Sequence, residues 1–379
     1  MKIKSSSSRL ESEHMKKSRR IFIAQVAACS ASAAMLSSKE AAAATNEPHA
    51  NYHLSGKAAA FVKTMGIKVP IIQAVTSVAG APELSVAAVC NAGGLGGFGV
   101  SWFSEEEIRS RVKQVKALTK SPFAVGYILA ISANTLQVAL DSGAPVVQFS
   151  FGMPTQKQVA AIRSAGGKFG IQISTAAGAR QALDLGTDYV NVQGQEAGGH
   201  IQAQGSWRDN LPHILDIAGA TPVNVAGGLS TGKDLRQILM LGASAGVFGT
   251  RFIATKEFPI HPEYKRRLMS AGSNDTVLTV CFDGGWPHAL HRALRNPTVD
   301  AWEAAGSPPP GARPGEGEII GMLGDLPVER YSILEPEADS TGKIGEMVEY
   351  AGLGVGAVHD IPTIAEVMDR IWKECRGTA

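Results

Sequence analysis

The chain has 379 residues, of which 44% are hydrophobic and 18% charged, and its formal net charge is +2 at neutral pH. This length allows one large α/β domain or two smaller ones and is ample for a sizeable core, as in an ordinary soluble enzyme. The 42 glycines and only 6% aromatic residues argue against a β-sandwich and favour tight βα turns.

The N-terminus has the composition of an export signal. Residues 18–24 read SRRIFIA, in which Arg19 and Arg20 precede a short apolar run, and small residues follow up to AAAAT at 41–45. This order of blocks resembles a twin-arginine signal. We therefore predict that residues 1–44 are a leader and signal peptide and that the protein is exported to a periplasm. The apolar run falls short of a stable membrane span, which needs about 20 residues.

Two features of this leader leave alternatives open. Met15 is a second candidate for the natural start, and Cys29 ends a stretch that weakly resembles a lipoprotein cleavage site, although the small-residue tail favours cleavage near Ala44. Removing residues 1–44 takes away eight Lys/Arg and three Asp/Glu, so 36 and 34 become 28 and 31 and the charge becomes −3. The basic balance belongs to the leader, and no nucleic-acid partner is predicted.

From residue 70 onward, short apolar runs alternate with helical segments. The runs span residues 70–74, 95–100, 123–129, 145–150, 169–173, 189–193, 222–226 and 245–250. Between them, residues 82–93, 104–119 and 230–243 carry helix start and stop signals, including a first-turn proline, a Ser cap with first-turn acids, and a final glycine. Eight strands that are apolar on both faces predict a (β/α)8 TIM barrel over residues 45–257. The alternative is a doubly wound sheet, but no G-x-G-x-x-G follows the first run.

The alternation ends after the eighth run. Residues 258–340 contain a Pro/Gly-rich stretch, and we predict a helical insertion there, either covering the barrel mouth or packed as an appendage without a role. Residues 341–379 are expected to form helices that close the barrel. Trp286, His288 and His291 lie in the insertion and are expected to be packing residues.

Polar side chains gather where the predicted strands end, which is where TIM barrels carry their active sites. They are Gln73, Gln148, Gln172 and Gln193, with Asn91 in a neighbouring turn and His200 behind a double glycine after the sixth run. One such glutamine is usually a satisfied core residue, whereas four at equivalent ends predict a polar-lined pocket. No metal site or disulfide is predicted, because no Cys/His spacing suits one among the three cysteines after the leader, Cys90, Cys281 and Cys375.

Two glycine turns follow the last two runs. Gly227 and Gly228 follow the seventh, and Gly249 and Thr250 follow the eighth. In TIM barrels these loops commonly hold a phosphate through backbone N–H donors, and glycine lets the backbone approach an anion closely. Thr250 could add a hydroxyl and Arg251 a charge. Two ordinary turns are the alternative, but the position of both turns favours a phosphate site.

The stretches PELSVAAVCNAGGLGGFG, VQGQEAGGH and AGGLSTGKDLRQILMLGASAGVFGTRF resemble the nitronate monooxygenases, formerly called 2-nitropropane dioxygenases, and the resemblance runs from about residue 56 to 372. It implies a bound FMN and a catalytic histidine at His200, with Glu196 more structural in role. The implied FMN contacts are Gly227, Gly228, Gly249 and Thr250 for the phosphate, and Ala74, Asn91, Gln172 and Gln193 near the ring.

The resemblance also implies a reaction, the oxidation of an alkyl nitronate by FMN and O2 to a carbonyl compound and nitrite. His200 could hold the anionic nitronate, or, when neutral, remove the α-proton of a nitroalkane, and both roles stay open. The chain departs from the family at Ala74-Val75-Thr76, where A-P-M is usual, which leaves the substrate open. The alternatives are an FMN-dependent NAD(P)H enoyl or quinone reductase, and an exported flavin-binding protein with little turnover.

Overall fold

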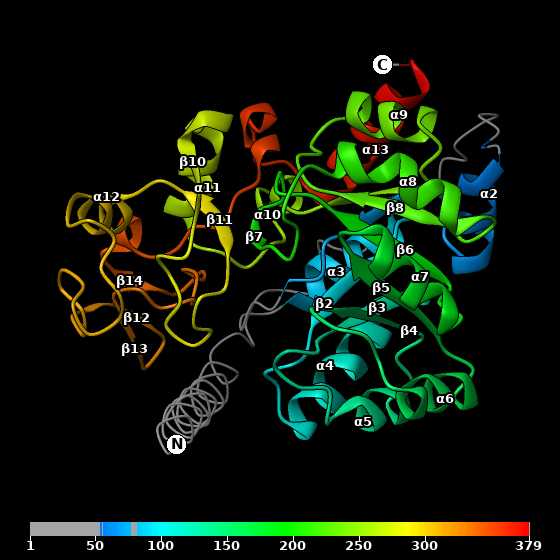
Figure 1. Ribbon diagram of the computed structural model, residues 1–379, viewed down its shortest axis with the longest axis horizontal. Coiled ribbons are helices and arrows are strands. Elements are labelled where there is room, and N and C mark those ends of the chain that lie inside the picture. The colour runs from blue at the N-terminus through cyan, green and yellow to red at the C-terminus, as the bar shows by residue number, and fades with distance from the viewer. Residues whose placement is uncertain (1–53, 55, 77–81, 379) are drawn as a thin grey trace, which may run out of the picture.

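The structure is a computed structural model that describes residue 54, residues 56–76 and residues 82–378; the predicted export signal lies outside this part of the chain. Eight parallel strands form a barrel (Figure 1). They are β1 (Ile71–Gln73), β2 (Gly96–Gly99), β3 (Phe123–Ile128), β4 (Val146–Ser150), β5 (Lys168–Ile173), β6 (Tyr189–Gln193), β8 (Val223–Ala226) and β9 (Ala245–Phe248). Bridges from Ile72 to Leu95 and from Thr76 to Phe98 join β1 to β2 and close the ring. The predicted TIM barrel is confirmed, and each strand lies within or next to its predicted run.

Helices on the outside of the barrel separate the strands. They are α3 (Pro82–Asn91), α4 (Glu105–Leu118), α5 (Leu136–Asp141), α6 (Gln156–Ser164), α7 (Ala176–Asp184), α8 (Trp207–Ala218), α9 (Gly232–Met240) and α13 (Ile364–Arg376). Several begin with a reciprocal capping box, as at Ser104 with Glu107 and at Thr231 with Asp234. None of the helices in the described ranges is long and apolar enough to cross a bilayer.

Helix α2 (Gly56–Met65) packs beside the N-terminal ends of the strands. The ring of Phe61 meets Tyr189, the first residue of β6, edge-on at 5.6 Å between centroids. Phe61 and Met65 belong to one buried cluster with residues from the starts of several strands, including Ala124, Val146 and Ala245. Because apolar side chains fill this end, the C-terminal end of the barrel is left to form a site.

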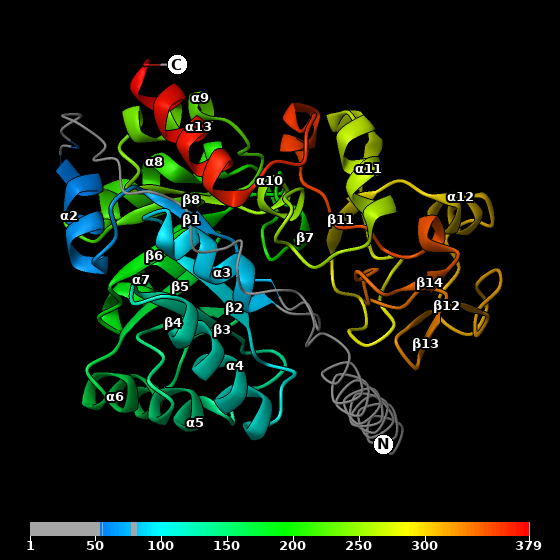
Figure 2. The same cartoon turned by 180° about the vertical axis from the view of Figure 1, so that it is seen from behind.

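A large insertion separates β9 from α13, and α13 then packs against α9 and α3 as the eighth outer helix (Figures 1 and 2). The insertion comprises α10 (Thr250–Ile253), α11 (Pro262–Ser270), β10 (Thr276–Thr279), β11 (His291–Leu294), α12 (Pro297–Ala304), β12 (Ile319–Leu323), β13 (Leu326–Glu329) and β14 (Thr341–Gly342), with short 3-10 turns at η1 (Ser273–Asp275), η2 (Ile344–Glu346) and η3 (Leu353–Ala357). The predicted insertion contains helices but is not helical throughout. Its strands also form two small antiparallel sheets, β13-β12-β14 and β10-β11-β7, the second completed by β7 (Gly199–His200) from the loop after β6. Closing helices were predicted for residues 341–379. Among the described residues of this segment, the structure has one α-helix, α13, which follows two 3-10 turns.

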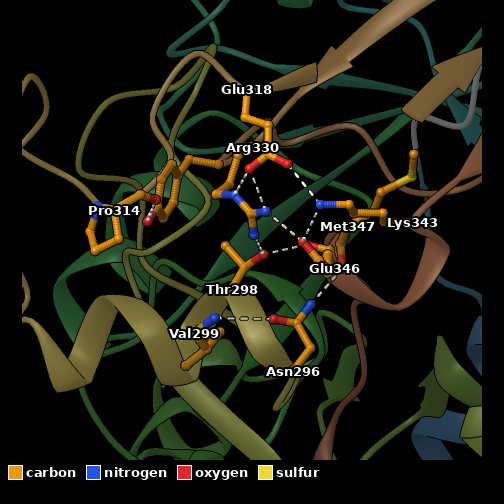
Figure 3. A network of polar contacts seen from close by, with 10 residues as sticks. Asn296, Thr298, Val299, Pro314, Glu318, Arg330, Lys343, Glu346 and Met347 are labelled. Atoms are coloured by element: carbon orange, nitrogen blue, oxygen red, sulfur yellow. Dashed lines mark hydrogen bonds and ion pairs between the residues drawn. The ribbon is translucent and has the colours of Figure 1, made fainter. Parts of the chain in front are cut away.

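A polar network holds the outer half of the insertion together (Figure 3). The guanidinium of Arg330 pairs with Glu318 at 2.7 Å and with Glu346 at 2.5 Å, and it donates to the hydroxyl of Thr298 at 3.0 Å. Lys343 also pairs with Glu318, at 2.7 Å. These contacts tie α12, the β12-β13 hairpin and the η2 turn into one lobe that lies beside the barrel.

Candidate functional site

A cavity of about 230 Å³ lies at the C-terminal ends of the barrel strands, and its wall includes residues of β2, β3, β4, β5, β6, β8 and β9 and of the segment that follows β1. The insertion supplies the opposite wall through Trp286, Glu335 and Tyr350, among others. Most of the residues predicted for the site line this one cavity: Ala74, Gln148, Gln172, Gln193, His200, Gly227, Gly228, Gly249 and Thr250. The structure thus brings the two glycine turns and the histidine together.

Three residues named from the sequence lie elsewhere. Asn91 is exposed at the end of α3, before β2 begins, and its amide donates to the carbonyl of Leu118 at 3.1 Å, so its prediction as a ring contact is wrong. Gln73 is buried, and its amide donates to the hydroxyl of Ser85 in α3 at 3.4 Å. Arg251 is buried and pairs with Asp360 at 2.9 Å, so its charge ties α10 to the segment before α13.

The EAGGH block, residues 196–200, forms a tight turn after β6. Glu196 is buried and accepts hydrogen bonds from the hydroxyl of Ser206 and the backbone N–H of Trp207, so it anchors the start of α8, the structural role expected of it. Gly198 lies against the backbone of Gly352, where an added β-carbon would come within 2.5 Å of a nitrogen. Gly199 has φ +76°, which favours glycine. The chain can therefore turn back as the short strand β7 (Gly199–His200), which pairs with β11.

His200 lies between the barrel and the insertion. Its ring stacks on Trp286 with centroids 4.5 Å apart and 23° between planes, and Tyr350 lies 5.4 Å away. The Nε2 atom is buried and has no hydrogen-bond partner among the described residues. Burial, with a smaller contribution from neighbouring His291, lowers the pKa of His200 to about 3. The imidazole is therefore neutral near physiological pH, with one ring nitrogen left for a ligand.

Glutamines fix the backbone around His200. The amide of Gln193 donates to the carbonyl of His200 at 3.1 Å and accepts from the N–H of Gln202 at 2.9 Å. The side chain of Gln202 in turn accepts from Gln172 at 3.3 Å and donates to the Gln172 carbonyl at 3.0 Å. Two of the predicted pocket glutamines therefore position the histidine strand from the ends of β5 and β6. A third, Gln148, accepts from Asn191 at 2.9 Å inside the barrel.

Unused backbone donors line the opposite part of the cavity. The N–H groups of Gly228, Leu229, Gly249 and Thr250 donate to no acceptor in the described part of the chain, and all four residues line the cavity. Gly228 has φ +73°, and an added β-carbon there would lie 3.2 Å from Cβ of Glu196. The hydroxyl oxygen of Thr250 accepts from the N–H of Gly352 at 3.0 Å, which leaves its hydrogen available. Several donors around one space suit an anion such as a phosphate.

The residues that depart from the family pattern also lie here. Val75 fills space beside two strand glycines, since a β-carbon at Gly126 would come within 2.2 Å of its Cγ1 and one at Gly97 within 3.1 Å of its Cγ2. Thr76 accepts a hydrogen bond from the N–H of Gly99 at 2.8 Å and so helps to close the barrel between β1 and β2. Both residues line the cavity, so the departure from the usual sequence falls in the cavity wall that follows β1.

The insertion contributes residues that the sequence did not identify. Trp286 was expected to be a packing residue, yet it lines the cavity over His200, whereas His291 is fully buried behind it. Glu335 and Tyr350 also line the cavity. One signal in the sequence pointed there: the two glycines before Trp286 in DGGW, of which Gly284 approaches Tyr331 and Ser332 too closely to carry a side chain. Within the described residues, no cluster of acidic, histidine or cysteine side chains suits a metal ion.

The sequence matches one protein family over most of its length. The family model described as "Nitronate monooxygenase" matches residues 58–135 and 127–374. A protein named nitronate monooxygenase from Pseudomonas aeruginosa is 28% identical over 84% of this chain and 99% of its own. A protein of Mycobacterium tuberculosis named (3aS,4S,5R,7aS)-5-hydroxy-7a-methyl-1-oxo-octahydro-1H-indene-4-carboxyl-CoA dehydrogenase is 34% identical over 63% of this chain and 67% of its own.

Solved structures give the same picture. FabK from Thermotoga maritima superposes with a TM-score of 0.69 at 26% identity and covers 86% of this chain and 97% of its own. The nitroalkane oxidase of Streptomyces ansochromogenes superposes with a TM-score of 0.67 at 26% identity, over 84% of this chain and 98% of its own. Both likenesses span the barrel and most of the insertion.

Proposed function

The chain belongs to the nitronate monooxygenase family of oxidoreductases, and from this premise we propose that it is an FMN-dependent enzyme that oxidises alkyl nitronates with O2 to a carbonyl compound and nitrite. The observation that carries the proposal is the meeting of two features in one cavity. The two glycine turns that line the cavity have backbone N–H groups without an acceptor among the described residues. His200 also lines the cavity, and its Nε2 has no hydrogen-bond partner there.

The residues present fit the FMN phosphate. The N–H groups of Gly228, Leu229, Gly249 and Thr250 offer donors that nothing else in the described chain uses. A β-carbon at Gly227 would come within 2.9 Å of the N–H of Ala197, so the turn stays close to the EAGGH block only without a side chain. Bound FMN would accept electrons from the substrate carbon and pass them to O2. The protein's own groups bind the anionic tail, exclude water and orient the substrate.

His200 is the group that we assign to the nitronate. Because burial keeps the imidazole neutral, it would hold the anionic nitro oxygens by hydrogen bonding from Nε2, in the tautomer that carries the proton there, and not by charge. Trp286 covers one face of the ring, which shields this hydrogen bond from water. A hydrogen bond in such a dry site is electrostatically stronger than in solvent.

The test is optical. Purified protein should show a flavin absorption spectrum, and FMN should be released on denaturation. Addition of an alkyl nitronate without air should bleach the spectrum, and air should restore it with formation of nitrite. A colourless protein that takes up no FMN would overturn the cofactor assignment, while bound FMN without turnover on nitronates, quinones or enoyl substrates would identify a flavin-binding protein.

A dehydrogenase or reductase reaction at the same cavity is the second candidate. It is favoured by the relative of 34% identity, whose name is that of a dehydrogenase acting on a carboxyl-CoA compound. The discriminating measurement is anaerobic reduction of the flavin by NAD(P)H compared with reduction by a nitronate. Faster reduction by NAD(P)H would select a reductase.

We also propose that the chain is exported through its first 44 residues, which lie outside the described part of the structure. The support is the order of the Arg19-Arg20 pair, the apolar run and the small-residue tail. Replacing both arginines with lysine should retain the full-length precursor in the cytoplasm of a bacterial host. Unchanged export of that variant would remove the twin-arginine assignment.

A further inference from the structure

We infer that Phe151 is a positioning residue of the cavity, whose left-handed backbone conformation places its ring so that it holds the indole of Trp286 against the imidazole of His200. The inference rests on the function proposed above, because it takes His200 as the group that contacts the substrate. It assigns Phe151 no contact with the reacting atoms, and its effect on turnover passes through Trp286.

Phe151 follows β4 directly and has an unusual backbone conformation. Its φ is +54°, in the left-handed region that a bulky residue rarely adopts and in which it is strained. Strain of this kind persists only where surrounding contacts fix it, and it gathers at functional sites. Phe151→Gly would remove the strain at once, since glycine adopts this conformation freely. We therefore attribute a role to the phenylalanine ring.

Contacts on two sides fix Phe151. Its ring meets the ring of Trp286 edge-on, with centroids 4.7 Å apart and 70° between planes. Its backbone N–H donates to the side-chain oxygen of Gln202 at 2.9 Å. The N–H of Gln202 donates to Gln193, and the amide of Gln193 donates to the carbonyl of His200. Because Trp286 stacks on His200, these contacts form a closed circuit around one side of the cavity.

The loop that carries Trp286 contains further strain. In the described part of the chain, four residues other than glycine have a positive φ: Phe151, His288, Ser307 and Tyr331. His288, with φ +58°, lies two residues after Trp286. Tyr331, with φ +71°, accepts at its carbonyl the N–H of Gly284 in the same loop, 2.9 Å away. Three of the four therefore bear on the placement of one indole, whereas Ser307 lies exposed after α12.

The position of the indole sets the position of the imidazole. No described residue donates to or accepts from Nε2 of His200, so ring contacts decide where this nitrogen points. The stacked ring of Trp286, at 4.5 Å and 23° between planes, leaves the imidazole no room to turn through that face. Misplacement of a substrate-contacting group by about 1 Å can cost about 100-fold in rate. Loss of the support under Trp286 is therefore expected to slow turnover.

The first test compares Phe151→Gly with the matched control Ser307→Gly in FMN-loaded protein. The two residues have nearly equal φ, +54° and +55°, so both variants relieve the same backbone strain. We expect Phe151→Gly to lower kcat for a nitronate at least about tenfold with FMN content unchanged, and Ser307→Gly to leave kcat unchanged. Unchanged kcat in Phe151→Gly would overturn the inference.

Action through Trp286 is tested by combining variants. Trp286→Ala should lower kcat at least as much as Phe151→Gly, and adding Phe151→Gly to it should cost less than about twofold more, since no indole is left to hold. Phe151→Tyr keeps the ring edge and should retain most of the turnover. Phe151→Leu keeps apolar bulk without that edge and should lose it. Losses that multiply in the double variant would show that Phe151 acts independently of Trp286 and would overturn the inference.

A second readout does not depend on turnover. The ring current of a stacked indole shifts the imidazole proton resonances of His200 upfield, and these resonances are identified in histidine-labelled protein by their absence from His200→Asn. We expect them to move downfield in Trp286→Ala and in Phe151→Gly, and to stay in place in Phe151→Tyr and Ser307→Gly. Resonances that do not move in Phe151→Gly would show that Phe151 does not hold the indole.

The two readouts separate this inference from the proposed function. If wild-type protein consumed no nitronate, the proposed function would fail, while the His200 resonances would still decide whether Phe151 positions the imidazole. If wild-type protein consumed nitronate and both kcat and the resonances were unchanged in Phe151→Gly, the inference would fail and the proposed function would stand.

Discussion

The two walls of the cavity are built differently. The barrel wall consists of strand ends, glycine turns and glutamines, and it offers backbone N–H groups and neutral amides. The insertion wall includes larger side chains, among them those of Trp286, Tyr350 and Glu335. The barrel side suits an anionic group such as a phosphate, whereas the insertion side presents larger aromatic and acidic residues to the same cavity. His200 joins the two, since its strand follows β6 and pairs with β11.

The two regions are also held together in different ways. Barrel helices begin with capping contacts three residues apart, as between Ser104 and Glu107. The insertion depends on contacts between distant residues, such as the buried pair of Asp283 with Arg313 at 2.7 Å. Local contacts allow each βα unit to be predicted from its own sequence, whereas the insertion depends on contacts between residues that are distant in the sequence.

The largest effect is expected where the two walls meet. His200→Asn removes the Nε2 group but leaves unchanged the two glycine turns that would hold the phosphate. We expect turnover of nitronate to fall at least about 100-fold with FMN content unchanged. Steady-state kinetics and the absorption spectrum check this together. Unchanged turnover would show that His200 has no role in the reaction. Loss of FMN would show that His200 also helps to bind the cofactor.

The stability of the insertion is tested by removing one charge from the buried ion pair of Asp283 with Arg313. Both side chains are about 5% exposed, and Asp283 also accepts from the N–H of His288 in the loop that carries Trp286. Asp283→Asn leaves the guanidinium of Arg313 buried without a counter-charge, which should lower the free energy of unfolding by about 3–5 kcal/mol. Urea denaturation measures the loss.

Replacing both partners of this pair, as Asp283→Leu with Arg313→Met, is the matched control. It should recover most of the stability, because no charge is left buried alone. An equal loss in the single and double variants would mean that packing, and not the unpaired charge, dominates. Removal of the exposed pair partner Glu303 should change stability by less than about 1 kcal/mol.

The different construction of the two regions explains what the sequence could predict. The eight strands, the main helices and the positions of Gly227, Gly228, Gly249 and Thr250 followed from local patterns. The strands of the insertion could not be predicted, because runs as short as TVLT and HRAL become strands only by pairing with each other and with β7. Glu335 and Tyr350 reach the cavity through that tertiary arrangement, so no local signal marks them. Asn91 was misplaced because it precedes its strand and so lies at the opposite end of the barrel.

The barrel wall is tested by a matched pair of glycines. Gly228 and Gly186 have φ of +73° and +70°, so alanine is strained at both by about 1–2 kcal/mol. A β-carbon at 186 meets nothing within 4 Å, whereas at 228 it lies 3.2 Å from Glu196 beside the unused N–H groups. Gly228→Ala should weaken FMN binding about tenfold, and Gly186→Ala should lower stability alone. Equal FMN affinity in the two variants would contradict the assignment of the FMN phosphate to this turn.

The smallest effect is expected from a single barrel cap. Ser104→Ala removes the hydroxyl that accepts from the N–H of Glu107 at 3.3 Å, and it leaves the carboxylate of Glu107 bonded to the backbone N–H of residue 104. Because half of the capping box survives and the site is exposed, we expect a loss of about 1 kcal/mol in the free energy of unfolding, with FMN content and turnover unchanged. A loss as large as that of Asp283→Asn would contradict the view that the barrel is stabilised by many small local contacts. A change in turnover would show that the outer helices act on the cavity, which nothing in the contacts of α4 suggests.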